Sequence, residues 1–135
     1  MSPKSIQNKS RKSILYVEDN PSNLRLIQSF IEGYSNFNFI SALNAKDGIA
    51  VARKSQPSLI LMDIDLPEIN GLTAFAMLQS WQETRSTPVI ALSASAMEHE
   101  IKNASNMGFK DYIIKPVDLT YLMGAIHKSV EIPLS

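Results

Sequence analysis

The chain has 135 residues, of which 44% are apolar and 19% are charged, with thirteen basic residues against thirteen acidic ones. These values predict one globular domain, and the balanced charge gives no reason to expect nucleic acid or an anionic membrane as a partner. Cysteine is absent, which excludes thiol chemistry and disulfides, and no apolar run is long enough for a signal peptide or a membrane span, so we expect a cytoplasmic protein.

Residues 1–12 are polar and without periodicity, which is typical of a flexible tail or linker. After them, five short apolar runs alternate with segments in which apolar residues recur at helical spacing. The apolar runs are residues 13–17, 37–42, 58–63, 88–93 and 111–114. The helical stripes are Leu24, Ile27 and Ile31; Ala45, Ile49 and Ala52; Ala74, Leu78 and Trp81; Met97, Ile101 and Ala104; and Leu119, Leu122, Met123, Ile126 and Val130. We expect the domain to span residues 13–131, followed by a C-terminal tail at 132–135.

Residues that favour helix ends support these limits. Pro21 suits the first turn of a helix, Gly33 and Gly108 suit the ends of helices, and Asn44 and Asp118 suit helix starts. Strict alternation of strands and helices predicts an α/β fold, a doubly wound parallel sheet with helices on both faces. The run 59–62 is apolar on both of its faces, as a central strand should be.

Charged side chains follow three of the predicted strands. Glu18 and Asp19 come directly after the first run, Asp63 closes the third, and Lys115 follows the fifth. The carboxyl ends of parallel strands converge on one crevice, so we expect these groups to lie close together. Neighbouring carboxylates repel one another, and a divalent cation would offset this; oxygen ligands suit Mg²⁺ or Mn²⁺ better than zinc. Asp63 can then act as a nucleophile toward a phosphoryl donor.

Each of these residues also has an ordinary structural explanation. A single carboxylate at a strand end is most often a helix cap or a loop residue, and a single lysine is most often a surface charge. Four such groups at three strand ends make that explanation improbable, and the whole set favours a phosphoryl site.

Four motifs carry a family resemblance: residues 14–20, 61–67, 88–94 and 111–116. In this order and at these intervals they resemble a response-regulator receiver domain, over essentially all of residues 13–131. The resemblance implies a five-stranded, flavodoxin-like (βα)5 fold with strand order 2-1-3-4-5. It also implies a role in two-component phosphorelay signalling rather than an enzyme of its own, although such domains assist their own phosphotransfer and dephosphorylation.

The resemblance assigns roles to the charged residues. Asp63 becomes the phosphoacceptor, supplied by a histidine kinase or a histidine phosphotransfer protein. Asp19 is expected to bind Mg²⁺ directly, Glu18 mostly through water, and Asp65 through its main-chain carbonyl, with Asp63 completing the metal ligands.

The resemblance also implies a phosphoryl-binding and switching set. Ser93, Ala94 and Lys115 are expected to bind the phosphoryl group, Tyr112 occupies the aromatic switch position, and the Lys115-Pro116 bond is expected to be cis. Taken alone, Ser93 fits an ordinary strand-end hydroxyl, Tyr112 a half-buried strand aromatic, and Pro116 a trans turn proline.

Phosphorylation is expected to change the surface formed by the helix around Ile101, strand 111–114 and the last helix, which an unknown downstream protein would read. Two positions depart from the commonest pattern of the family: Asp65, two residues after the phosphoacceptor, and Ser95, two residues after Ser93. The resemblance suggests that both adjust how quickly the phosphorylated form hydrolyses.

Three alternatives stay open at this point. A haloacid-dehalogenase-type phosphatase also uses a motif like Asp63-Ile64-Asp65, but usually near its N-terminus. A flavodoxin-like electron carrier would need a phosphate loop after the first strand, where this chain places acids. A receiver that serves only as an interaction module would not need the complete acidic set. The motifs look most like receivers of hybrid histidine kinases, so we expect either a stand-alone regulator or one part of a larger kinase.

Overall fold

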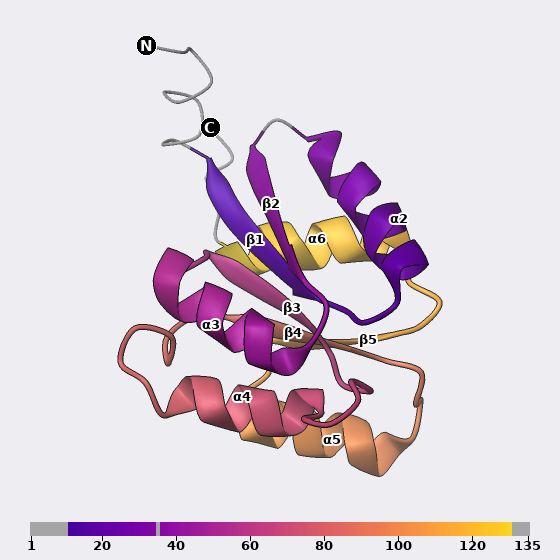
Figure 1. The fold of residues 1–135 in the computed structure, drawn as a ribbon. Coiled ribbons are helices and arrows are strands. Elements are labelled where there is room, and N and C mark those ends of the chain that lie inside the picture. Colours follow the sequence, from indigo (N-terminus) through magenta and orange to yellow (C-terminus); the bar gives the residue numbers. More distant parts are fainter. Residues whose placement is uncertain (1–10, 35, 131–135) are drawn as a thin grey trace.

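The computed structural model describes residues 11–34 and 36–130. Five parallel strands form one sheet in the order β2-β1-β3-β4-β5, which confirms the predicted architecture (Figure 1). The strands are β1 (Lys12–Val17), β2 (Phe37–Ala42), β3 (Leu59–Asp63), β4 (Val89–Ser93) and β5 (Asp111–Ile114). The chain reverses its direction of travel across the sheet after β2, so β1 and β3 lie side by side and their carboxyl ends border the crevice.

Five helices cover the two faces of this sheet. They are α2 (Pro21–Glu32), α3 (Ala45–Ser55), α4 (Gly71–Gln79), α5 (Glu98–Met107) and α6 (Leu119–Val130). Helices α2 and α6 pack on one face, and α3, α4 and α5 pack on the other (Figure 1). Each strand therefore buries alternate side chains in two separate clusters, one on each side of the sheet.

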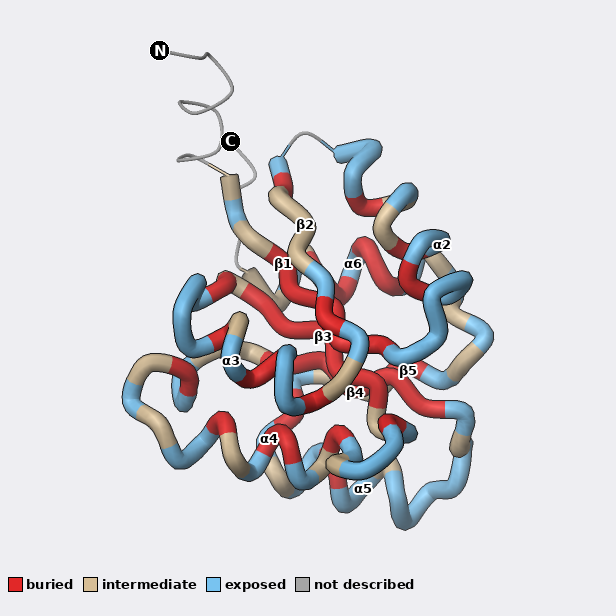
Figure 2. The backbone as a smooth tube through the Cα atoms, in the orientation of Figure 1, coloured by how far each residue is buried: buried red, intermediate tan, exposed pale blue. Residues whose placement is uncertain are grey.

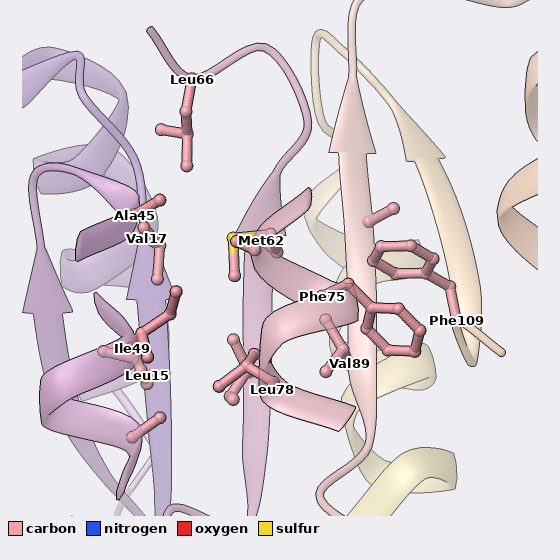
Figure 3. Close-up of a cluster of buried hydrophobic side chains, with 14 of the residues drawn as sticks. Leu15, Val17, Ala45, Ile49, Met62, Leu66, Phe75, Leu78, Val89 and Phe109 are labelled. Carbon is pink, nitrogen blue, oxygen red and sulfur yellow. The ribbon is translucent and has the colours of Figure 1, made fainter. Parts of the chain in front are cut away.

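The centre of the sheet is buried on both faces. All five residues of β3 and all five of β4 are buried, whereas the outer surfaces of the helices are exposed (Figure 2). On the face of α3, α4 and α5, the rings of Phe75 and Phe109 stack with their centroids 4.1 Å apart, beside Val89 (Figure 3). Burying one large apolar side chain of this kind contributes about 1.5–3 kcal/mol. This rigid centre fixes the ends of β3 and β4.

The helix starts predicted at Pro21, Asn44 and Asp118 are confirmed, and Asn20 is a further cap that the sequence analysis did not name. Asn20 accepts hydrogen bonds from the first amides of α2, with Pro21 in its first turn, and Asn44 accepts one from the first turn of α3. The Asp118 carboxylate accepts a hydrogen bond of 3.0 Å from the Tyr121 amide of α6.

The predicted glycine caps differ in backbone conformation. Gly108 ends α5 in the left-handed region, with φ of 118°. Gly33 ends α2 with ordinary helical dihedral angles, so its position does not require glycine.

Helix α4 is shorter than the predicted stripe. It ends at Gln79, and Trp81 lies beyond it with the Arg53 guanidinium 4.3 Å above its ring. Just beyond this end, the Thr84 hydroxyl donates a hydrogen bond of 2.7 Å to the Leu78 carbonyl and so takes up an acceptor that a longer helix would have bonded internally. At α5, Met97 is the N-cap residue and is 56% exposed, so it does not join the buried stripe.

Strand β1 begins at Lys12, one residue inside the predicted tail, and β3 and β4 each begin one residue later than predicted. Most of the predicted N-terminal tail, and the predicted C-terminal tail at 132–135, lie outside the described residues. Within residues 11–34 and 36–130, no helix has the length and apolar character that crossing a membrane requires.

The start of α4 lies directly against the end of β3. A Cβ atom added at Gly71 would lie 2.5 Å from the Asp63 carbonyl oxygen, which is closer than real Cβ contacts come. The Gly71 amide donates a hydrogen bond of 3.0 Å to the Ile64 carbonyl. Only glycine allows this approach, and it holds the backbone that follows Asp63 against α4.

Candidate functional site

The predicted acidic residues come together at the carboxyl ends of β1 and β3. Asp63 is the last residue of β3, and Glu18 follows β1 directly. Glu18, Asp19 and Asp63 each place one carboxylate oxygen within 4.8 Å of a carboxylate oxygen of the other two residues. Glu18 and Asp63 are 1% and 2% exposed, while Asp19 is exposed at the mouth of the crevice.

Lys115 reaches this group from β5, two strands away from β3. Its ammonium Nζ lies 3.0 Å from Glu18 Oε1 and 3.1 Å from Asp63 Oδ2. The main chain holds it there, because the Lys115 amide donates a hydrogen bond of 2.8 Å to the Ser93 carbonyl. The Lys115-Pro116 peptide bond is cis. We call Glu18, Asp63 and Lys115 the acid–lysine cluster.

The charges of the site suit a divalent cation. The group holds three carboxylates and one ammonium, which contacts Glu18 and Asp63, so negative charge is in excess at the site. Every side chain that could donate to a cation here offers oxygen, which matches the preference of Mg²⁺. The residues present therefore fit the metal that the sequence predicts.

Burial and mutual contact shift the acid–base behaviour of the cluster. Burial, together with the hydrogen bond to Glu18, raises the pKa of Asp63 from 3.8 to about 6. Burial also works to raise the pKa of Glu18, but its hydrogen bonds, above all with Asp63 and Lys115, outweigh it and hold that pKa below its ordinary value. Burial works to lower the pKa of Lys115, yet its two carboxylate partners outweigh it, so its pKa is raised and it keeps its charge.

The second oxygen of Asp63 contacts the loop after β3. Its Oδ1 accepts a hydrogen bond of 2.9 Å from the Asp65 amide. The side chain of Asp65 reaches across to the end of β4, where its Oδ2 lies 3.2 Å from the Ala94 amide nitrogen and 3.5 Å from the Ser93 hydroxyl, both of which donate to it. We call this the Asp65 contact. It places a carboxylate on the two donors that the sequence predicts for the phosphoryl group.

A chain of hydrogen bonds leads from Ser93 to Tyr112. The Ser93 hydroxyl accepts from the Ser95 amide at 3.1 Å, and the Ser95 carbonyl accepts from the Tyr112 hydroxyl at 2.9 Å. The Ser95 hydroxyl in turn donates to the Glu100 carboxylate of α5. A crevice of about 500 Å³ lies between these residues and Asp65. Tyr112 is therefore linked to the Ser93 end of the site through Ser95.

The sequence analysis missed one residue of the site, Tyr16. Its hydroxyl donates a hydrogen bond of 2.8 Å to Glu18 Oε1, and burial together with this bond raises its pKa. The signal was present, because Tyr16 is two residues before Glu18, the period at which an extended chain returns a side chain to the same side, and it is a polar group inside an apolar run.

Known proteins with related sequences and structures share this arrangement of elements. The family model described as "Response regulator receiver domain" matches residues 14–127. The polar-differentiation response regulator DivK of Brucella anthropi is 39% identical over 108 residues, which cover 80% of this chain and 87% of DivK. A response regulator from Desulfuromonas acetoxidans superposes with a TM-score of 0.81 at 32% identity, covering 89% of this chain and 97% of that one.

A further structural relative was solved with a metal. The receiver domain of sensor histidine kinase PA1611 from Pseudomonas aeruginosa PAO1 superposes with a TM-score of 0.81 at 26% identity, covering 90% of this chain and 99% of that one. That protein contains a magnesium ion coordinated in its active-site cleft. With the family model matched over 14–127 and a curated relative 39% identical, this chain belongs to the response regulator receiver domains of two-component signalling.

Proposed function

We propose that Asp63 accepts a phosphoryl group from a phosphohistidine of a histidine kinase or of a histidine phosphotransfer protein. Receiver domains as a family accept phosphoryl groups from such donors and bind Mg²⁺ in their active site. The observation that carries the assignment is the position of the Asp63 carboxylate: it ends the central strand, is 2% exposed, and is paired with the Lys115 ammonium at 3.1 Å.

Asp19, Glu18, Asp63 and the main-chain carbonyl of Asp65 are the groups that would hold Mg²⁺ or Mn²⁺. When bound, the cation offsets the negative charge of the phosphoryl oxygens. One Asp63 oxygen attacks phosphorus, the phosphorus–nitrogen bond of the phosphohistidine breaks, and its electron pair stays on the imidazole nitrogen, which takes up a proton. The product is an aspartyl phosphate. The Lys115 ammonium, which already contacts Asp63, would then pair with a phosphoryl oxygen.

Ser93 and Ala94 would supply the remaining hydrogen bonds to the phosphoryl group. In the structure both donors are taken by Asp65 Oδ2, at 3.5 Å and 3.2 Å. The Asp65 carboxylate would therefore have to leave before the phosphoryl group could bind them. This supports a role for the Asp65 side chain in setting the rate of phosphorylation and the lifetime of the aspartyl phosphate, in addition to the role of its main-chain carbonyl as a metal ligand.

The switched surface would be the one formed by α5, β5 and α6. When the Ser93 hydroxyl turns to the phosphoryl group, its hydrogen bond with the Ser95 amide would be lost. Ser95 would then be free to move, and its hydrogen bond with the Tyr112 hydroxyl would change with it. Ile114 and Tyr121, 41% and 51% exposed, lie on this surface and would contact a downstream protein. The result is a shift between two populated arrangements, driven by contacts that only one of them makes.

The family match does not favour the alternatives of a haloacid-dehalogenase-type phosphatase or a receiver that only mediates interactions. The chain is a signalling domain, and we propose that any catalysis is limited to its own phosphorylation and dephosphorylation. The cytoplasmic location, the domain limits at 13 and 131, and the likeness to hybrid-kinase receivers stay predictions of the sequence.

Intact mass after incubation with Mg²⁺ and acetyl phosphate tests the assignment. We expect the wild-type chain to gain one phosphoryl group, and Asp63→Asn to gain none because its amide is not a nucleophile. Omitting Mg²⁺ should abolish the gain in the wild type. Equal modification of Asp63→Asn, or no modification of the wild type, would overturn the proposal.

A further inference from the structure

Tyr16 and Lys115 share one oxygen of Glu18. The Glu18 Oε1 atom accepts a hydrogen bond of 2.8 Å from the Tyr16 hydroxyl and one of 3.0 Å from Lys115 Nζ. The other oxygen, Oε2, accepts from the Asn20 amide at 3.2 Å. Besides its contact with Asp63, Glu18 is therefore a buried carboxylate bonded to the ammonium of Lys115 and to two donors, Tyr16 and the Asn20 amide, that belong to β1 and the loop after it.

The two donors to Oε1 differ in their freedom to move. Tyr16 is 1% exposed, is the second-to-last residue of β1, and packs in the cluster that includes Leu61 and Ile27. The Lys115 side chain is 21% exposed and has three rotatable donors. Both residues line a hollow of about 370 Å³. The Lys115 side chain therefore has free space beside it, whereas the Tyr16 ring is held by the core.

We infer that Tyr16 is a positioning residue that allows Lys115 to leave Glu18. This rests on the proposed function, in which the ammonium moves from the carboxylates to the phosphoryl group. At that moment Oε1 loses one donor, and the Tyr16 hydroxyl keeps it bonded and in place. Without the hydroxyl, Oε1 would be left buried with no donor from either residue, a state that is costly for a charged group.

The simpler explanation is that Tyr16 fills the core and its hydroxyl merely bonds to the nearest acceptor. The two explanations differ in which state of the protein needs the hydroxyl. A structural hydroxyl stabilises both states equally and leaves phosphoryl binding unchanged. A hydroxyl that replaces Lys115 at Glu18 matters most after the lysine has moved.

The test uses Tyr16→Phe, which keeps the ring and removes only the oxygen, and beryllium fluoride as a phosphoryl mimic at saturating Mg²⁺. Amide NMR titrations of the full chain measure the affinity for Mg²⁺ alone and then for beryllium fluoride. We expect the Mg²⁺ affinity to stay within about twofold of the wild type and the beryllium fluoride affinity to fall about tenfold, the size of one lost hydrogen bond to a charged group. Ile14→Val, a buried change in the same strand that touches no polar contact, should alter neither affinity.

A double-mutant cycle with Lys115→Met, which removes every donor of that side chain, isolates the shared oxygen. In that background Oε1 lacks the ammonium in both states, so adding Tyr16→Phe should no longer change beryllium fluoride affinity. An unchanged affinity in Tyr16→Phe alone, an equal loss for Mg²⁺ and beryllium fluoride, or the same effect in both backgrounds would each overturn the inference. If the wild type itself binds no beryllium fluoride, the proposed function fails and the inference fails with it; if the wild type binds and Tyr16→Phe binds equally, only the inference fails.

Discussion

The acid–lysine cluster and the Asp65 contact lie side by side but differ in how firmly they are held. In the cluster, Lys115 joins two buried carboxylates at 3.0 Å and 3.1 Å. In the Asp65 contact, an exposed carboxylate accepts from Ala94 at 3.2 Å and from Ser93 at 3.5 Å, the second at the outer limit of a hydrogen bond. The half of the site proposed to bind the cation is therefore preformed, whereas the half proposed to bind the phosphoryl group would have to exchange a partner before it could act.

The contrast follows from the backbone. Glu18 and Asp63 adjoin strands whose ends are fixed by the buried sheet, and Gly71 holds the residues after Asp63 against α4. Asp65 and Ala94 lie on loops that the solvent reaches. Loops of this kind open at a lower free-energy cost than core strands do.

Removing the Lys115 charge should have the largest effect, because it leaves two buried carboxylates facing each other. We expect Lys115→Met, which keeps the length and apolar stem, to lower the free energy of unfolding without Mg²⁺ by roughly 2–4 kcal/mol, somewhat below the figure for a fully buried pair because the ammonium is partly exposed. Saturating Mg²⁺ should recover part of this loss by supplying positive charge to the same carboxylates. Urea unfolding with and without Mg²⁺ measures both.

Lys110→Met is the matched control, since Lys110 is an exposed lysine immediately before β5. Its free energy of unfolding should stay within about 0.5 kcal/mol of the wild type. If both variants behave alike, the ammonium of Lys115 does not hold the cluster together.

The pKa of Asp63 predicts a dependence of stability on pH in the metal-free protein. Burial and the neighbouring Glu18 raise this pKa to about 6 from 3.8, so the folded state binds the proton more tightly than the unfolded state does. The contribution of Asp63 to the free energy of unfolding is therefore largest at pH values below its pKa in the unfolded chain. It is lost as the pH rises through its pKa in the folded protein. Between about pH 4 and about pH 7 this loss should be roughly 1–3 kcal/mol.

The measurement is the difference in unfolding free energy between the wild type and Asp63→Asn at several pH values. Without Mg²⁺ the wild type should lose stability relative to the variant as the pH rises over this range. Saturating Mg²⁺ should flatten the difference, because the cation stabilises the charged carboxylate. A difference that is already flat in the metal-free protein would contradict the raised pKa.

The sequence located the cluster because strand topology decides it. Once the order of strands is fixed, a residue that ends β3 and one that follows β1 must lie at the same edge of the sheet, whatever their side-chain rotamers. Lys115 joins them for the same reason. The direction of the Tyr16 hydroxyl and the reach of Asp65 to Ala94 depend on rotamers and loop conformation, which periodicity does not encode. The end of α4 escaped prediction because the hydrogen bond from the Thr84 hydroxyl to the Leu78 carbonyl forms in the turn after the helix, and the spacing of apolar residues does not record such a bond.

Neutralising Asp65 should have the smallest effect of the three changes and the most specific one. Hydrogen bonds to a carboxylate are roughly twice as strong as those to a neutral group, so the Asp65→Asn amide should compete less well for Ser93 and Ala94. At saturating Mg²⁺ we expect beryllium fluoride to bind about tenfold more tightly, a change of about 1.4 kcal/mol. The decay rate of the phosphorylated form should also change while phosphorylation itself is retained.

Glu68→Gln controls for the loss of one negative charge, because Glu68 is exposed on the same loop between β3 and α4. It should leave both quantities close to those of the wild type. If Asp65→Asn and the wild type show the same affinity and the same decay rate, the Asp65 carboxylate does not compete with the phosphoryl group. Both halves of the site would then be preformed, because displacing Asp65 from Ser93 and Ala94 would require no measurable free energy.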